Sequence, residues 1–144
     1  MHLLRVALLF VVTLAACSQE RQSVQGTPSG EALVSALQGH WCLSGDEGRS
    51  CWGYDRFQGN NVYACGRFPD DGKSFAAKAS FTVSGQTACY TVIESDDLRA
   101  YSIGHKFCAR VLEINEKFQR YELDGEVYYT YRVKAGEAVC SGAP

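Results

Sequence analysis

The side chains with the clearest chemistry in this sequence are its seven cysteines. A thiol can form a disulfide, bind a metal ion or carry a covalent group, and spacing helps to separate these roles. No two cysteines stand in a Cys-x-x-Cys pair, which argues against a zinc site. Because the count is odd, one thiol needs a role of its own. Cys17 is set apart in the N-terminal segment, and the other six are Cys42, Cys51, Cys65, Cys89, Cys108 and Cys140.

Cys17 ends a segment that has the features of an export signal. Arg5 precedes an apolar run that extends from Val6 to Leu14. The run is too short to cross ~30 Å of hydrocarbon as a helix. Residues 1–16 are therefore predicted to be a signal peptide. The alternative is an ordinary secretory signal cleaved after Ala16, which would leave Cys17 free or paired.

The sequence Leu14-Ala15-Ala16-Cys17 resembles the lipobox of bacterial lipoproteins. This resemblance implies cleavage before Cys17, diacylglycerol on its sulfur and an acyl group such as palmitate on its new amino group. Three acyl chains would attach the protein stably to a membrane, since each buried CH₂ contributes about 0.8 kcal/mol. Ser18, in place of Asp, resembles the pattern for release to the outer membrane. The expected location is the periplasmic face of that membrane in the bacterial envelope.

An exported chain enters an oxidising compartment, so the other six cysteines are predicted to form disulfides. Cys89 and Cys108 lie on consecutive predicted strands, where a hairpin can bring them face to face. Cys42 and Cys51 flank a turn-rich loop and can also meet. These two pairs would leave Cys65 for Cys140.

No catalytic constellation is recognisable. The two histidines of the processed chain, His40 and His105, have no partners at metal-binding or catalytic spacing. Neighbouring carboxylates occur only in turns, where adjacent side chains point apart. We therefore predict no enzyme, no cofactor and no metal. A net charge of −2 provides no basic surface for nucleic acid.

Two segments precede the predicted sheet. Residues 17–29 are polar, with a composition typical of a flexible tether. Ser29 is the predicted N-cap of a short helix in which Leu33, Val34 and Leu37 fall at helical spacing. Residues 30–144 are predicted to form one folded domain.

After the helix the hydrophobic period changes to two, and turn residues recur at short intervals. Alternation in Ser74–Ser84 places Phe75, Ala77, Ala79, Phe81 and Val83 on a core face. In the last strand the same alternation assigns Val127, Tyr129, Tyr131 and Val133 to the core. The predicted class is all-β, a small antiparallel up-and-down barrel stapled by disulfides, with a sandwich as the alternative. The predicted strands are His40–Leu43, Cys51–Gln58, Val62–Phe68, Ser74–Ser84, Thr87–Glu94, Lys106–Ile114, Phe118–Leu123 and Glu126–Val133.

Gly39-His40-Trp41, on the first strand, resembles the Gly-x-Trp signature of lipocalins and their small bacterial relatives. Arg132, on the last strand, matches the Arg that packs over this Trp in the family and closes one end of the barrel. The family's mid-chain Thr-Asp-Tyr segment is missing, which counts against a ligand cavity. The alternative is that Gly39 ends the helix and Trp41 simply fills the core. The stretch around Cys89 and Cys108 also resembles exported bacterial domains of unknown function.

The expected function is a non-enzymatic binding or interaction module of unknown activity. We expect a filled barrel, with Phe75, Phe81, Tyr90, Tyr129 and Tyr131 occupying its middle. One alternative is a carrier of a small hydrophobic ligand, which requires a cavity with Ala77 and Ala79 facing inward. The other is a protein-facing module, such as an inhibitor of a host hydrolase like lysozyme, that contacts its partner through the loop Leu43–Arg49 or Asp96–Gly104.

Overall fold

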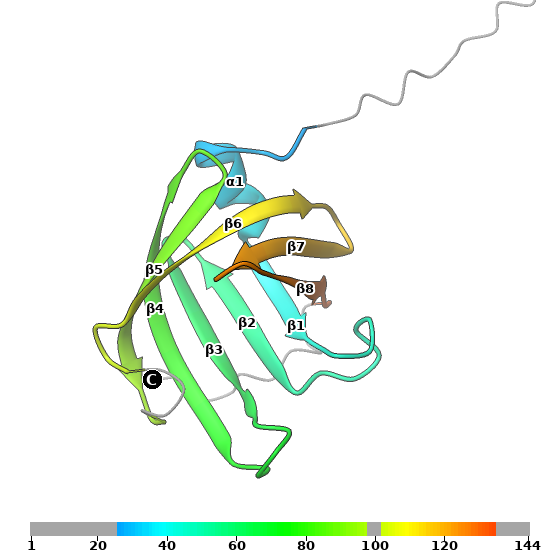
Figure 1. The fold of residues 1–144 in the computed structure, drawn as a ribbon, viewed down its shortest axis with the longest axis vertical. Coiled ribbons are helices and arrows are strands. Elements are labelled where there is room, and N and C mark those ends of the chain that lie inside the picture. Colours follow the sequence, from blue (N-terminus) through cyan, green and yellow to red (C-terminus); the bar gives the residue numbers. More distant parts are fainter. Residues whose placement is uncertain (1–25, 98–101, 135–144) are drawn as a thin grey trace, which may run out of the picture.

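Eight antiparallel strands in chain order close into a barrel in the computed structural model, which describes residues 26–97 and 102–134 (Figure 1). Each strand pairs with the next, and the last pairs back with the first. The predicted up-and-down barrel is confirmed and the sandwich is excluded. Predicted and observed strand ends differ by at most two residues. The strands are β1 Gly39–Leu43, β2 Gly53–Gln58, β3 Asn61–Arg67, β4 Ser74–Ser84, β5 Thr87–Ser95, β6 Lys106–Ile114, β7 Phe118–Leu123 and β8 Glu126–Arg132.

A single short helix, α1 (Gly30–Leu37), covers one end of the barrel (Figure 1). Leu33 and Leu37 are fully buried, as their helical spacing predicts. Ser29 occupies the predicted N-cap position, although its side chain makes no capping hydrogen bond. The start of the helix is held instead by the Gly30 N–H, which donates to the carbonyl of Gly85 at 2.9 Å.

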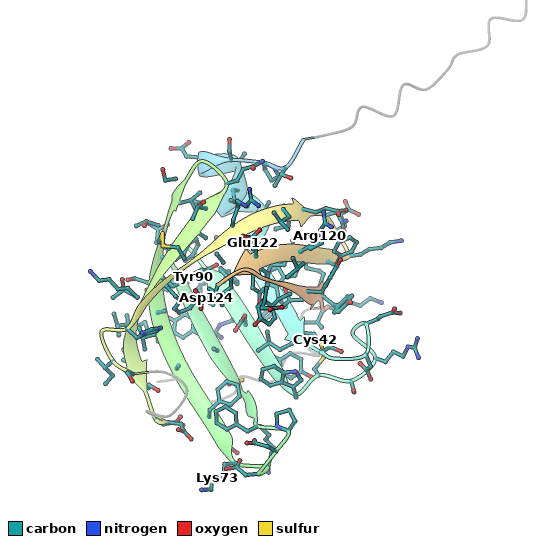
Figure 2. The ribbon with its side chains drawn as sticks, viewed as in Figure 1. Cys42, Lys73, Tyr90, Arg120, Glu122 and Asp124 are labelled. Atoms are coloured by element: carbon teal, nitrogen blue, oxygen red, sulfur yellow. A yellow bond between two sulfur atoms is a disulfide. The ribbon has the colours of Figure 1, made fainter. Side chains whose placement is uncertain are left out.

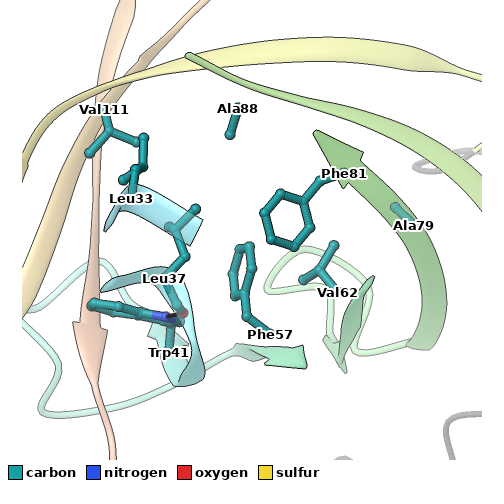
Figure 3. Close-up of a cluster of buried hydrophobic side chains, with 9 residues drawn as sticks. All are labelled: Leu33, Leu37, Trp41, Phe57, Val62, Ala79, Phe81, Ala88 and Val111. Atoms are coloured by element: carbon teal, nitrogen blue, oxygen red, sulfur yellow. Dashed lines mark hydrogen bonds between the residues drawn. The ribbon is translucent and has the colours of Figure 1, made fainter. Parts of the chain in front are cut away.

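The main hydrophobic cluster lies at the helix end of the barrel (Figure 3). Phe57 and Phe81 meet edge to face there, with ring centroids 5.3 Å apart. Edge-to-face aromatic pairs add stability to that which comes from burying their surface. The cluster comprises Leu33, Leu37, Trp41, Phe57, Val62, Ala79, Phe81, Ala88 and Val111.

The prediction of which residues point into the barrel is correct for β4 and wrong for β8. Phe75, Ala77, Ala79 and Phe81 are all buried. In β8, however, the buried residue is Thr130, which lies opposite the buried Gln119 of β7, whereas Tyr129 is 44% exposed. Tyrosines occupy both faces of β8, so the hydrophobic pattern could not determine which face points inward.

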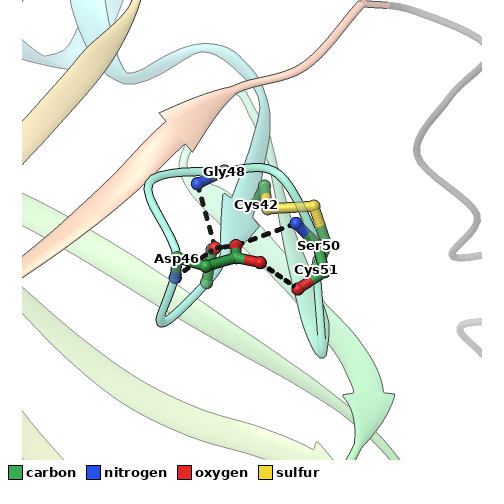
Figure 4. Close-up of a disulfide and its surroundings, with 6 residues drawn as sticks. Cys42, Asp46, Gly48, Ser50 and Cys51 are labelled. Atoms are coloured by element: carbon green, nitrogen blue, oxygen red, sulfur yellow. Dashed lines mark hydrogen bonds between the residues drawn. A yellow bond between two sulfur atoms is a disulfide. The ribbon is translucent and has the colours of Figure 1, made fainter.

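Two disulfides join the strands as predicted. Cys89 and Cys108 lie opposite each other on β5 and β6, and Cys42 and Cys51 close the loop between β1 and β2 (Figure 4). Cys65 is also disulfide-bonded. Cys17 and Cys140 lie outside the described residues.

The described part of the chain contains no helix long and apolar enough to cross a membrane.

The segment before α1 is fixed by hydrogen bonds to the barrel. The Thr27 hydroxyl donates to the carbonyl of Leu112 at 2.6 Å, and Gln86 donates to the carbonyl of Thr27 at 3.2 Å. The chain is therefore already held against the barrel at Thr27, within the range assigned to the tether.

Candidate ligand-binding cavity

The barrel contains a cavity of about 690 Å³. Leu43 and Trp52, at the β1–β2 loop, and Asp124, in the β7–β8 turn, line it. These connections lie at the end of the barrel away from α1, so the cavity opens there. The prediction of a filled barrel is wrong.

The cavity exists because the barrel wall carries small side chains at several inward positions. Ala64 of β3 lies opposite Ala77 of β4 in the sheet register, and Ala79 and Ala109 also line the cavity. The methyl group of an alanine is too short to reach the middle of the barrel, so space remains there. Phe81, expected to fill the middle, packs instead in the cluster near the helix.

The wall is mainly apolar, but a carboxyl group lies within it. Asp55 sits on β2 between Gly53 and Phe57, and the register places it opposite Trp41 on one side and Ala64 on the other. It has no hydrogen-bond or ion-pair partner among the described residues. The accessible part of its side chain faces the cavity, and protein surrounds it otherwise. Burial raises the pKa of Asp55 from 3.8 to about 7.

Phenol groups come close to this carboxyl. Burial is the main cause that raises the pKa of Tyr90 above its ordinary value, and the nearby groups of Asp55 and Tyr121 raise it further. Figure 2 labels Tyr90 within the barrel. Tyr121 stacks on Tyr128 of β8, with ring centroids 5.7 Å apart. The interior therefore combines apolar walls with a small polar group, an arrangement common in ligand sites.

The opposite end of the barrel is closed by Trp41 and Arg132. The guanidinium carbon of Arg132 lies 3.9 Å from the centroid of the Trp41 ring. Arg132 also donates to the carbonyl of Gln38, and at 2.9 Å to that of Ala36, both at the end of α1. Trp41 Nε1 donates to the carbonyl of Leu37 at 2.7 Å (Figure 3). The structure thus brings together the two residues of the expected closing pair.

Gly39 is required for this closure. Its backbone φ of +109° is one that residues with a side chain rarely adopt, and an added Cβ would lie 2.8 Å from Arg132 Nη1. The residue that ends the helix is Gln38, one position earlier. The Gly-His-Trp sequence therefore does more than end a helix and fill the core.

The histidines are not brought into a shared site. His40 lies on β1, which pairs with β2 and β8. His105 precedes β6 at the cavity opening, where its ring stacks on Phe107 at a centroid distance of 5.9 Å. Within residues 26–97 and 102–134 there is no cluster of three or more His, Cys, Asp or Glu side chains suited to a metal ion.

No family model and no curated protein matches the sequence. Among solved structures, a lipocalin-like protein from Bacteroides uniformis superposes with a TM-score of 0.55 at 14% sequence identity, over 68% of this chain and 99% of that one. The fold is lipocalin-like. An uncharacterized protein from Bacteroides eggerthii gives a TM-score of 0.49 at 15% identity, over 67% and 98% of the two chains.

Sequence reasoning missed the most unusual residue of this lipocalin-like barrel, Asp55. A detectable signal existed, because Asp55 and Phe57 are two residues apart in a predicted strand and must share a face. Since Phe57 is apolar and belongs inside, the acid beside it on that face also points inward.

Proposed function

We propose that this protein is a non-enzymatic binding module that holds a small, largely apolar ligand inside its barrel. The cavity of about 690 Å³ carries the proposal. Its size falls within the range of roughly 300 to 1,000 Å³ found for ligand pockets. This observation favours the carrier alternative over the filled barrel.

The composition of the wall supports an apolar ligand. Val62, Val92 and Val111 contribute branched side chains, and Phe57 and Phe107 contribute aromatic rings. Burial of apolar ligand surface against such walls is favourable by about 25 cal/mol per Å² removed from water, before the cost of association is subtracted. The polar groups in the wall, which include Asp55, Gln119 and Tyr121, can fix the orientation of the ligand while the apolar side chains supply most of its affinity.

We further propose that Cys17 carries acyl chains and anchors the module to the bacterial outer membrane on its periplasmic side. The lipobox sequence Leu14-Ala15-Ala16-Cys17 supports this attachment. The disulfides support an oxidising compartment, because such bonds persist outside the cytoplasm.

Native mass spectrometry of the full chain, purified from its own envelope in a mild detergent, tests the binding proposal. We expect a retained small molecule whose loss on activation restores the mass of the free protein. Protein that carries no retained mass, and that also fails to bind the uncharged apolar probe 4-phenylbutanol, would contradict the proposal.

A filled-cavity variant provides the matched comparison. Ala77→Phe places a large ring at an inward position of β4, whereas Ser80→Phe places the same ring on the outer face of that strand. The inward ring should reduce binding of 4-phenylbutanol at least about tenfold, because it occupies the ligand volume. The outer ring should leave binding within about twofold of the parent protein. Equal effects of the two substitutions would indicate that the ligand binds elsewhere.

A further inference from the structure

The charges around the cavity all have the same sign except at its edge. Three carboxyl groups line it, those of Glu47, Asp55 and Asp124. Within residues 26–97 and 102–134, no Lys or Arg side chain lines it, and the one basic group there is His105 at the opening. An anionic ligand would therefore be repelled by Asp55 inside the cavity, whereas a cation would be attracted.

Basic residues close in sequence to the cavity-lining positions make their contacts outside the cavity. Arg56, beside Asp55 on β2, stacks on the Tyr63 ring at 4.6 Å. Arg132 is engaged with Trp41 at the closed end. Lys78 pairs with Glu94 at 3.3 Å on β4 and β5. None of these cations neutralises Asp55, so this carboxyl group has no counter-ion among the residues that the structure describes.

Room for a counter-ion exists beside that carboxyl. The neighbour of Asp55 across the sheet is Ala64, and the neighbour of Ala64 is Ala77. These two methyl groups leave open space next to the carboxyl oxygens, where a longer side chain would otherwise fill it. Burial also raises the pKa of this carboxyl to about 7, which indicates that protein groups provide little compensation for its charge.

Aromatic rings surround the same space. Tyr90 interacts electrostatically with Asp55, and Tyr90 stacks on Phe107 with centroids 4.9 Å apart. Phe57 lies 6.3 Å from Tyr90, centroid to centroid. A carboxylate combined with aromatic faces is the chemical environment that attracts an organic ammonium group, through an ion pair and cation–π contacts.

We infer that the cavity selects amphipathic amines, with the ammonium group of the ligand paired to Asp55 and its apolar body against the valine and alanine wall. This inference rests on the proposed function, because it specifies the ligand class of the same cavity. It distinguishes this barrel from one that accepts any apolar molecule of suitable size.

Three probes that differ only in their polar group test the inference: 4-phenylbutylamine, 4-phenylbutanol and 4-phenylbutyrate. Isothermal titration of the full chain near pH 8, in a non-ionic detergent with the same buffer as reference, measures their affinities. The amine is protonated and Asp55 mostly ionised at this pH. We expect the amine to bind at least about tenfold more tightly than the alcohol, and the carboxylate to bind most weakly.

Asp55→Asn is the decisive variant, since it keeps the shape of the side chain and removes its charge. It should abolish the preference for the amine and change affinity for the alcohol by less than about threefold. Glu31→Gln, on the helix at the closed end, is the matched control and should retain the preference. If the parent protein binds alcohol and amine equally, or if Asp55→Asn retains the preference, the inference fails while the binding function stands. If none of the three probes binds, the proposed function itself fails.

Discussion

Asp55 couples the stability of the barrel to pH. Its pKa is about 7 in the folded protein, against 3.8 for the ordinary value. Below about pH 4 the group is protonated in both the folded and the unfolded state, so it does not lower the free energy of unfolding. Between about pH 4 and 7 only the unfolded chain releases the proton, so the free energy of unfolding falls as pH rises. Above pH 7 Asp55 is ionised in both states, and the free energy of unfolding falls no further through this group.

Asp55→Asn should therefore stabilise the protein at high pH only. We expect the free energy of unfolding to increase by about 2 to 4 kcal/mol near pH 8, because each unit of pKa shift corresponds to about 1.4 kcal/mol. Denaturant unfolding at a series of pH values measures this difference. A gain of the same size at pH 3.5 and at pH 8 would show that the effect comes from packing rather than from the charge.

Arg132 should contribute more to stability than a surface arginine does. Arg132→Met removes a cation–π contact and leaves the carbonyls of Ala36 and Gln38 without their donor, so we expect a loss of about 2 to 4 kcal/mol. Arg110→Met, which removes only an exposed pair with Glu122 at 2.8 Å, should cost less than about 1 kcal/mol. Urea unfolding of both variants provides the comparison. Similar losses would mean that Arg132 does not close the barrel end.

Among the elements, the β1–β2 loop is held by a network around one carboxylate (Figure 4). Asp46 accepts hydrogen bonds from the Ser44 hydroxyl at 2.6 Å and from the Ser50 amide at 2.8 Å and hydroxyl at 2.6 Å. These bonds, the Ser44 hydroxyl first, lower the pKa of Asp46 well below its ordinary value. The loop is thus ordered at the edge of the cavity although Asp46 itself is only partly buried.

Asp46→Ala should loosen this loop without unfolding the barrel. The Ser50 amide loses its acceptor, so its hydrogen exchange should become at least about tenfold faster, as measured by NMR. In the parent protein the same protection should persist at neutral pH and disappear only as pH falls below about 4, through the lowered pKa. Glu47→Gln, which removes the charge of a neighbouring residue in an exposed contact with Arg49 at 3.6 Å, is the control. Unchanged exchange in Asp46→Ala would show that the disulfide alone orders the loop.

The elements themselves were largely predictable, but the interior was not. The alternation in Ser74–Ser84 correctly located β4 and its inward face, because a period of two is a local property of the backbone. The position of Phe81 along the barrel axis depends on how all eight strands are staggered, and no single strand contains that information. The cavity therefore could not be predicted, whereas the inward direction of Asp55 could have been inferred from Phe57.

For the whole molecule, the anchor at Cys17 is the expectation with the simplest test. Globomycin blocks the peptidase that cleaves lipoprotein signals, so treated cells should accumulate a precursor that retains residues 1–16. The mature protein from untreated cells should carry the added mass of acyl chains on an N-terminal Cys17, measured by mass spectrometry of the N-terminal peptide. An unmodified Cys17, with no precursor under globomycin, would indicate ordinary secretion.

The two ends of the barrel also differ in their relation to the N-terminal segment. Residues 26–29 meet the barrel beside α1, at the sealed end, and the open end is on the far side (Figure 1). The residues between Cys17 and Gly26 can extend at most about 30 Å. With Cys17 embedded in a leaflet, the entrance would face away from the lipid. A ligand would then enter the cavity from the aqueous phase.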